Sequence, residues 1–397
     1  MTISIKYATL LLSGKKVIIV YVKTRTVRIY PNSHMRTELD KLCDYRRYCW
    51  NLGLETWNEM YDLHLLDKKN NPSPSEHKVR NYLVANKQDW QYALSARVLQ
   101  QGISDLGNAW KHFFDKSLSD WGKPKFKSKK APRQGFKSDR IKFVGGKLRL
   151  DKPRENKSVW YDIRIRGNLL PYDYGTVSIY RVNSKYYASI PYKIEEIENK
   201  PKTNQSTAVD VNVGHLNYTE GSINVLPKKL TKLYDRIKHY QKMLARKQPG
   251  SINYDEVRAK LQRDYTKVAN LQHDIIHKFT TSLVENYDTI VIEDLDVKHM
   301  KMGVASKGLQ RAQFGYFRQC LTYKCEWYGK QLVIADRFYP STQRCSECGN
   351  IKTGDDKITL SGNVKHHTRH NEYICYNCGA ILDRDENAVQ NLLQLTN

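Results

Sequence analysis

The stretch TAVDVNV at residues 207–213 has the composition of an apolar β-strand, and it begins the part of the chain from which the fold class can be predicted. Helical patterns follow it at residues 228–247 and 254–286. A second apolar strand, DTIVIED at 288–294, a helix near 308–329 and the strand QLVIAD at 331–336 come next. Strands that alternate with helices predict an α/β layer fold for this part of the chain.

Three acidic residues lie within or next to apolar segments that are expected to be buried. Asp210 lies inside the first apolar strand, where an ionised group is costly unless it is paired or binds a metal. Glu293 ends the strand IVIE, and Asp385 opens the last helical segment, DENAVQNLL. Carboxylates that meet at one sheet edge suit Mg²⁺, and two such ions promote phosphodiester hydrolysis. Two alternatives stay open, since Asp385 has the residue type of an N-cap and Glu293 that of a surface acid.

The cysteines give the strongest metal signal. Two Cys-x-x-Cys pairs, each followed by Gly, predict one closed, structural Zn²⁺ site, and their members are Cys345, Cys348, Cys375 and Cys378. The 26 residues between the pairs exceed the usual interval. That interval contains His366, His367 and His370, which are alternative ligands, solvated loop residues or phosphate contacts. A reducing cytosol disfavours disulfides. The remaining cysteines lie on helical patterns and are expected to be buried, namely Cys43, Cys49, Cys320 and Cys325.

The first half of the chain reads as a basic β unit with a helical insertion. Residues 17–30 form a strand pattern that pairs with the apolar residues before Ser13-Gly14, and a second β run covers 176–193. Helical spacing at 36–61 and 91–118 predicts the insertion. Sixteen Lys and Arg against four acids lie between Lys123 and Arg166, and the polar stretch at 194–206 reads as a linker.

The charge balance points to a polyanionic partner. The formal net charge is +25, and clustered positive charge favours a phosphate backbone. The 27 tyrosines suit base stacking on single-stranded nucleic acid, although most are expected to pack in cores. No apolar run is long enough for a membrane helix and no signal-peptide cleavage site is evident, so we expect a cytoplasmic protein that does not bind membranes.

The order of the motifs resembles the TnpB family, the transposon-encoded nucleases regarded as ancestral to the type V CRISPR effectors. The resemblance extends from about Val27 to Leu393. The segments that carry it are VRIYPN, VLQQGISDLGNAWKHFF, KPKFKSKK, AVDVNVG, DIIHKFTTSLVENYD, IVIEDLDVK, YKCEWYG, PSTQRCSECG and DRDENAVQNL.

The resemblance implies a multidomain fold that mixes α/β and β architecture. It implies a wedge β-barrel at 1–32 and 122–193, a helical recognition domain at 33–121 and a linker at 194–206. It further implies a RuvC (RNase H-like) domain at 207–340 and 380–397, interrupted by a zinc ribbon at 341–379. The implied activity is RNA-guided, Mg²⁺-dependent DNA cleavage at a single RuvC site. The implied partners are a guide RNA from the transposon end and a double-stranded DNA target, bound by a monomer.

The resemblance also assigns roles to residues. Asp210, Glu293 and Asp385 match the catalytic acids, and Asp385 is preferred to Asp383 because it lies two residues before Asn387. The residues expected to contact nucleic acid are Gln100, Arg97 and Ser95 as readers of the target-flanking motif, and Lys123, Lys125, Lys127 and Arg384 at phosphates.

One position departs from the family, since Asn212 stands where many relatives have Gly, and its side chain is expected to narrow the site. Two other functions stay open beside the nuclease. One is an RNA-guided repressor that binds DNA with little or no cleavage, and the other is a compact type V CRISPR effector.

Overall fold

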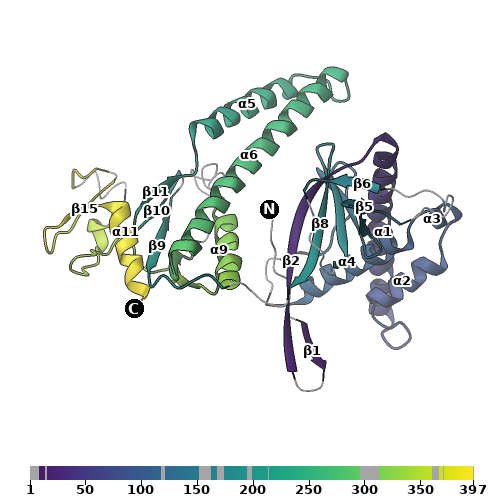
Figure 1. Ribbon diagram of the computed structural model, residues 1–397, viewed down its shortest axis with the longest axis horizontal. Coiled ribbons are helices and arrows are strands. Elements are labelled where there is room, and N and C mark those ends of the chain that lie inside the picture. Colours follow the sequence, from purple (N-terminus) through teal and green to yellow (C-terminus); the bar gives the residue numbers. More distant parts are fainter. Residues whose placement is uncertain are drawn as a thin grey trace. The chain divides into compact units, whose positions relative to one another are not determined.

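The computed structural model describes residues 9–13, 16–117, 121–151, 162–167, 174–194, 199–212, 214–295, 313–359, 366–369 and 371–396. The chain divides into two compact units, Met1–Glu196 and Ile197–Asn397 (Figure 1). Among the described residues, no helix combines the length and apolarity that crossing a membrane requires.

Unit 1 is built on an eight-stranded antiparallel sheet with the order β3-β7-β8-β2-β6-β5-β4, in which β1 pairs with β2. The strands are β1 (Thr9–Ser13), β2 (Lys16–Tyr30), β3 (Arg133–Ser138), β4 (Lys142–Val144), β5 (Lys147–Arg149), β6 (Asp162–Ile165), β7 (Val177–Val182) and β8 (Lys185–Ile194). The predicted hairpin at the start of the chain is confirmed, because β1 and β2 pair in register from Thr9↔Val20 to Ser13↔Lys16.

Four helices are inserted between β2 and β3, where helical spacing at 36–61 and 91–118 predicts a helical insertion. They are α1 (Ser33–Leu66), α2 (Glu76–Ala85), α3 (Asp89–Tyr92) and α4 (Ala96–Phe114). The side chains of Asn32 and Ser75 accept hydrogen bonds from the first turns of α1 and α2, which fixes both starts. The helical pattern predicted at 91–118 is confirmed by α4, but its bounds were too wide, because extended backbone at Ser95 separates α3 from α4 and Asp115 ends α4.

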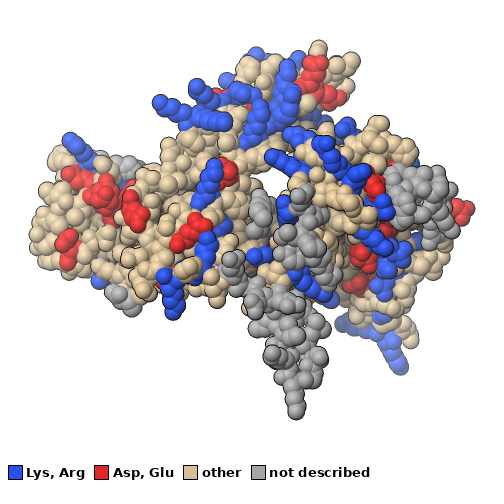
Figure 2. Space-filling model, in the orientation of Figure 1, with Lys and Arg blue, Asp and Glu red and all other residues tan. Residues whose placement is uncertain are grey.

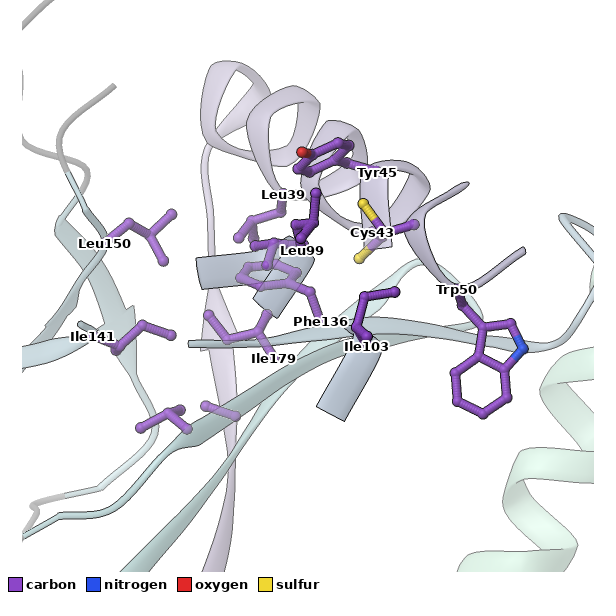
Figure 3. Close-up of a cluster of buried hydrophobic side chains, with 14 of the residues drawn as sticks. Leu39, Cys43, Tyr45, Trp50, Leu99, Ile103, Phe136, Ile141, Leu150 and Ile179 are labelled. Atoms are coloured by element: carbon purple, nitrogen blue, oxygen red, sulfur yellow. The ribbon is translucent and has the colours of Figure 1, made fainter. Parts of the chain in front are cut away.

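The helices and the sheet of unit 1 share one hydrophobic core. Helix α4 buries one apolar stripe, which includes Val98, Ile103 and Leu106, while α1 contributes Leu39 and Cys43. Figure 3 shows helical side chains of this core, among them Leu39, Leu99 and Ile103, facing Phe136 and Ile179 of the strands. The insertion is therefore packed against the sheet of the same unit.

Unit 2 contains a five-stranded mixed sheet with the order β11-β10-β9-β12-β13. Strands β9 (Ser206–Val211), β12 (Thr289–Glu293) and β13 (Gln331–Ala335) are parallel, and β10 (His215–Tyr218) and β11 (Gly221–Asn224) extend the sheet as a hairpin. The helices are α5 (Lys228–Ala245), α6 (Ile252–Asn286), α9 (Phe314–Tyr328) and α11 (Arg384–Leu393). The expected α/β order is confirmed; the predicted helix near 308–329 is described only from its α9 part.

Helices α5 and α6 form a basic hairpin. Leu230, Leu233 and Ile237 of α5 are buried against Val268 of α6. The opposite face of α5 is exposed and basic, and it contributes to the concentration of Lys and Arg along this hairpin in Figure 2, with Lys228, Lys229, Lys232, Arg236, Lys238 and Lys242.

Candidate active site and metal centre

Three parallel strands place Asp210 and Glu293 in one row across the sheet. Strand β12 pairs in parallel with β9 up to Ile292↔Val209, so Glu293 follows beside Asp210. On the outer sides, Asn217 pairs with Asp210 and Ala335 pairs with Glu293. Because alternate residues of a strand share a face, the two carboxylates lie on the face that carries Ala208 and Val291.

Helix α11 covers that face and brings the third acid. Val389 and Leu392 pack with Ala208, Val291 and Ala335 in a small buried cluster. The helix begins directly after β15 (Ile381–Asp383), the strand that pairs with β14 (Glu372–Ile374) in the last part of the chain. Asp385 therefore lies in the first turn of a helix that packs on β9 and β12.

The neighbour of Asp385 provides the helix cap. The side chain of Asp383 accepts hydrogen bonds from the backbone N–H groups of Asp385 and Glu386. The alternative reading of Asp385 as the N-cap is therefore wrong, and its carboxylate is available for other partners. Asp383 thus has the capping role, and the choice of Asp385 over Asp383 as the functional acid stays a prediction.

Two residues of β10 hold the Asp385 carboxylate, and the sequence prediction missed both. His215 Nε2 lies 3.1 Å from Asp385 Oδ2, and Asn217 Nδ2 donates to the same oxygen at 3.0 Å. Arg384 donates to the other oxygen from Nη2 at 2.9 Å. The sequence does contain a signal for this pair. His215 and Asn217 are two residues apart, so they share one face of the strand that follows AVDVNVG.

The electrostatics of the cluster favour a cation. Burial, together with the charges of Glu293 and Asp385, raises the pKa of Asp210 to about 7. Burial also raises the pKa of Glu293. Burial raises the pKa of Asp385 as well, but hydrogen bonds from His215 and Arg384 outweigh it and the net pKa lies below the usual value. Ionised together, the carboxylates repel one another, and a bound cation would relieve that repulsion.

The three acids have the chemistry of magnesium ligands, whereas the cysteines form a separate group. Among the described residues, the only group of three or more His, Cys, Asp or Glu side chains with metal-ligand spacing is formed by Cys345, Cys348, Cys375 and Cys378. Carboxylates are hard oxygen ligands of the kind that Mg²⁺ prefers, and Mg²⁺ usually keeps water and substrate oxygens as further ligands.

A short segment after β13 connects Glu293 to the helix that carries Asp385. Ser341 donates its hydroxyl hydrogen to Glu293 Oε1. Asn391 Nδ2 donates to the carbonyl oxygen of Ser341 at 2.8 Å and to that of Arg344 at 2.7 Å. Asn387 and Asn391 are both almost fully buried, so these bonds lie in a protected environment. This clamp fixes the separation between Glu293 and Asp385.

The four predicted cysteines converge as a zinc site requires. Cys345 Sγ lies 3.8 Å from Cys378 Sγ, and Cys348 Sγ lies 3.6 Å from Cys375 Sγ. A tetrahedral centre with zinc–sulfur bonds of about 2.3 Å has sulfur–sulfur edges of about 3.8 Å, so the spacing fits zinc. The backbone N–H of Asn350 and the side chain of Asn377 lower the pKa of Cys348 to about 6, which favours its thiolate, the form that a metal binds.

The two knuckles have the same backbone geometry. The glycines that follow them, Gly349 and Gly379, both have φ of 75° and donate to the carbonyl oxygens of Cys345 and Cys375, each at 2.9 Å. A residue with a side chain would be strained there, so the glycine after each pair is a requirement of the turn. His366 lies beside Asp356, 3.1 Å away, and neither it nor His367 belongs to the cysteine cluster. His370 lies outside the described residues.

The predicted readers of the flanking motif bond to residues of their own unit. Arg97 Nη1 donates to Gln100 Oε1 at 2.9 Å, and its Nε lies 3.5 Å from Asp139. Ser95 donates to Asp151 Oδ2 at 3.1 Å. Their role toward nucleic acid stays a prediction.

The basic segment KPKFKSKK is fastened to α1. Asn51 makes a paired contact with Lys127, donating to its carbonyl oxygen at 3.1 Å and accepting from its N–H at 2.7 Å. Trp50 Nε1 donates to the carbonyl oxygen of Lys125 at 3.0 Å. The Lys127 ammonium lies 3.5 Å from the centre of the Trp50 ring, and burial lowers its pKa to about 7. Lys123 and Lys125 are exposed.

Comparison with known proteins identifies the family. Residues 189–303 match the OrfB_IS605 model, described as "Probable transposase", and residues 314–392 match the Cas12f1-like TNB domain. A relative from Streptomyces pristinaespiralis, named "Putative RNA-guided DNA endonuclease", is 30% identical over 305 residues, which cover 76% of this chain and 71% of the relative. The chain belongs to the TnpB family.

Other relatives agree with the TnpB assignment. The Escherichia coli (strain K12) protein named "Putative RNA-guided DNA endonuclease InsQ" is 25% identical over 348 residues, covering 81% of this chain and 82% of the relative. The endodeoxyribonuclease Cas12f1 of Sulfoacidibacillus thermotolerans is 30% identical over 132 residues, covering 32% of this chain and 28% of the relative. The expected relation of this TnpB protein to compact CRISPR effectors is therefore confirmed.

The structure of this TnpB protein departs from one family description. Residues 23–64 match a model described as a helix-turn-helix domain. Here they form the end of β2 and most of the single helix α1, with Pro31 and Asn32 between them. The matched residues therefore contain one helix and not the two helices of a helix-turn-helix motif.

Asn212, the departure noted in the sequence, contacts the acid cluster of this TnpB protein. Its Nδ2 donates to Asp210 Oδ2 at 2.7 Å. The bond lowers the pKa of Asp210 and partly opposes the effect of burial. The Asn212 side chain thus forms a hydrogen bond with one of the two carboxylate oxygens of Asp210.

Proposed function

We propose that this TnpB protein is an RNA-guided DNA endonuclease with a single RuvC site formed by Asp210, Glu293 and Asp385. The observation that carries the proposal is the convergence of Asp210 and Glu293 in one row of the sheet with Asp385 above it. The raised pKa of Asp210, which burial and the two other carboxylates produce, supports a cation-binding role. Relatives that carry the name of RNA-guided DNA endonuclease support the substrate class.

In the proposed mechanism, Asp210, Glu293 and Asp385 would hold two Mg²⁺ ions. Bound Mg²⁺ supplies Lewis-acid activation of the phosphodiester and of an attacking water. The protein contributes orientation, since His215 and Asn217 fix the Asp385 carboxylate and Ser341 fixes that of Glu293. Ionisation of Asp210 accompanies metal binding, because an acid with a pKa of about 7 is partly protonated at neutral pH.

The zinc ribbon has a structural role in this proposal. Four thiolates fill a tetrahedral shell and leave no position for substrate. Ser346, inside the first knuckle, donates its N–H to Asn387 of α11 at 2.8 Å. One bound Zn²⁺ would therefore hold the first knuckle in place and, through Asn387, the helix that carries Asp385.

The proposed partners are a guide RNA, which pairs with the target strand, and double-stranded DNA. Positive charge on both units would neutralise the phosphates of this complex. Gln100, Arg97 and Ser95 are proposed to read the flanking motif. Phosphate contacts are proposed for Lys123, Lys125, Lys127 and Arg384. The complex is proposed to act in the cytoplasm as one protein chain with one RNA.

The test is to purify the protein with RNA co-expressed from its flanking DNA and to sequence that RNA. The RNA guide is then replaced, and cleavage of matched and unmatched plasmids is measured with Mg²⁺. Cleavage that follows the new guide supports the proposal. Binding that follows the guide without cleavage supports the repressor alternative, and RNA-independent cleavage contradicts both.

A further inference from the structure

The loop after β13 leaves the sheet at the level of the acid cluster. Ala335 is the last residue of β13 and pairs with Glu293, whose other neighbour in the row is Asp210. Phe338 follows only three residues later. Its side chain is 87% exposed, the largest value among the exposed large hydrophobic residues of the described chain.

The backbone around this aromatic side chain is held at several points. The N–H of Phe338 donates to Asp336 Oδ1 at 2.8 Å. On the other side, the Tyr339 hydroxyl donates to the carbonyl oxygen of Asn391 at 2.8 Å, and Ser341 bonds to Glu293. The ring is therefore presented to solvent from a fixed turn, and the same turn holds an acid of the site.

Positive charge accompanies the ring. Arg337, directly before Phe338, and Arg318 of α9 both bond to Asp294, the residue after Glu293. Their side chains stay 48% and 44% exposed. Both arginines therefore place positive charge beside the turn that carries Phe338.

A single exposed aromatic residue is common on protein surfaces and indicates nothing by itself. Ile252, at the start of α6, is also 80% exposed, and it lies on a helix and not on the sheet that carries Asp210 and Glu293. Phe338 differs from Ile252 in two respects. It follows three residues after Ala335, which pairs with Glu293, and its backbone is held by hydrogen bonds beside two arginines. An aromatic face next to cations is the arrangement that binds single-stranded nucleic acid.

We propose that Phe338 stacks on a nucleobase of the DNA strand that enters the carboxylate cluster, close to the scissile phosphate. This role rests on the proposed nuclease function and makes Phe338 a positioning residue. The stacked base would fix the register of the strand, while Arg337 and Arg318 would contact its backbone. The ring would accept any base, because each base has a π face.

The test compares Phe338→Ala, Phe338→Leu and Phe338→Trp with wild type in the RNA-loaded protein, and Ile252→Ala is the matched control. The substrate is a single DNA strand complementary to the guide, and KM and kcat are measured separately. Loss of one stacking contact is expected to raise KM by roughly five- to 150-fold for the Ala and Leu variants. The Trp variant should stay near wild type, as should the control.

Binding of the same strand without Mg²⁺, with 2-aminopurine fluorescence as the readout of stacking, separates this inference from the nuclease proposal. Quenching in wild type and Phe338→Trp that is lost in Phe338→Ala supports the inference even if no variant cuts DNA. A Phe338→Leu variant equal to wild type overturns it, because leucine keeps apolar contact without a stacking face. Equal KM and equal quenching for wild type and Phe338→Ala also overturn it.

Discussion

Replacing Asp210 by Asn should stabilise the protein in the absence of Mg²⁺, and the gain should depend on pH. The reason is the pKa of Asp210, which burial and the charges of Glu293 and Asp385 raise from 3.8 to about 7. At about 1.4 kcal/mol for each pKa unit, ionising this group in the folded state costs up to about 4 kcal/mol. Asn keeps the shape, has no charge and can still accept the hydrogen bond of Asn212.

The sign follows from the direction of the shift. Because the folded-state pKa lies above the unfolded value, the folded state holds the proton more tightly and loses relative stability as pH rises. The advantage of Asp210→Asn should therefore be absent near pH 4, grow up to about pH 7 and then stay constant. A change of 1 kcal/mol moves Tm by about 2–4 °C in domains of this size, so the gain at pH 8 should reach several degrees.

The assay is thermal unfolding of the full chain between pH 5 and 8, with and without Mg²⁺. With Mg²⁺ the wild type should gain stability and the variant should gain little. Asp288→Asn is a control of opposite sign, since a hydrogen bond from Lys330 and two backbone N–H groups lowers the pKa of Asp288 to about 2. It should reduce stability throughout this range. An Asp210→Asn variant that is less stable than wild type at pH 8 without Mg²⁺, or a gain that does not change with pH, refutes this reasoning.

Three further predictions address the zinc site and unit 1. Removing zinc with a strong chelator should release one Zn²⁺ per chain by elemental analysis and reduce the thermal stability of unit 2, and Cys378→Ala should do the same; a stable, zinc-free wild type contradicts the ribbon assignment. Gly135→Ala should destabilise unit 1 by about 1–3 kcal/mol in denaturant titrations, because the added Cβ would lie 2.6 Å from a backbone oxygen of β7, whereas Gly122→Ala, with nothing within 4 Å, should be nearly neutral. Asn51→Ala removes two hydrogen bonds to Lys127, which are worth about 1 kcal/mol each, and should weaken RNA binding in electrophoretic assays although no charge changes; unchanged affinity would mean that this anchor is irrelevant to binding.

Local pattern was sufficient for the strands and for the zinc ligands. Apolar runs such as TIVIE predict a buried strand from composition alone, and the spacing of two knuckles predicts a tetrahedral sulfur site before any coordinates exist. The same kind of signal made the helical pattern at 91–118 longer than α4, since its apolar spacing continues across Ser95, where only the backbone torsion reveals the break.

The partners of the acids were beyond sequence reasoning because they depend on register and packing. His215 and Asn217 contact Asp385 only because β10 pairs beside β9 and α11 lies over both. Asn391 contacts the Ser341 backbone across a sequence separation of 50 residues, and no periodicity encodes that pairing. A burial argument could have identified it in part, since two asparagines on the apolar face of α11 require internal partners.

The central claim is tested most directly by measuring cleavage of a guide-matched plasmid with Mg²⁺ by the RNA-loaded variants Asp210→Asn, Glu293→Gln and Asp385→Asn. The matched control is Asp383→Asn, which changes the neighbouring acid but keeps a good N-cap. The account predicts that the three amide variants bind the target with the affinity of wild type and do not cut it, while Asp383→Asn cuts normally. Cleavage by Asp385→Asn at the wild-type rate, or loss of cleavage in Asp383→Asn alone, would contradict it.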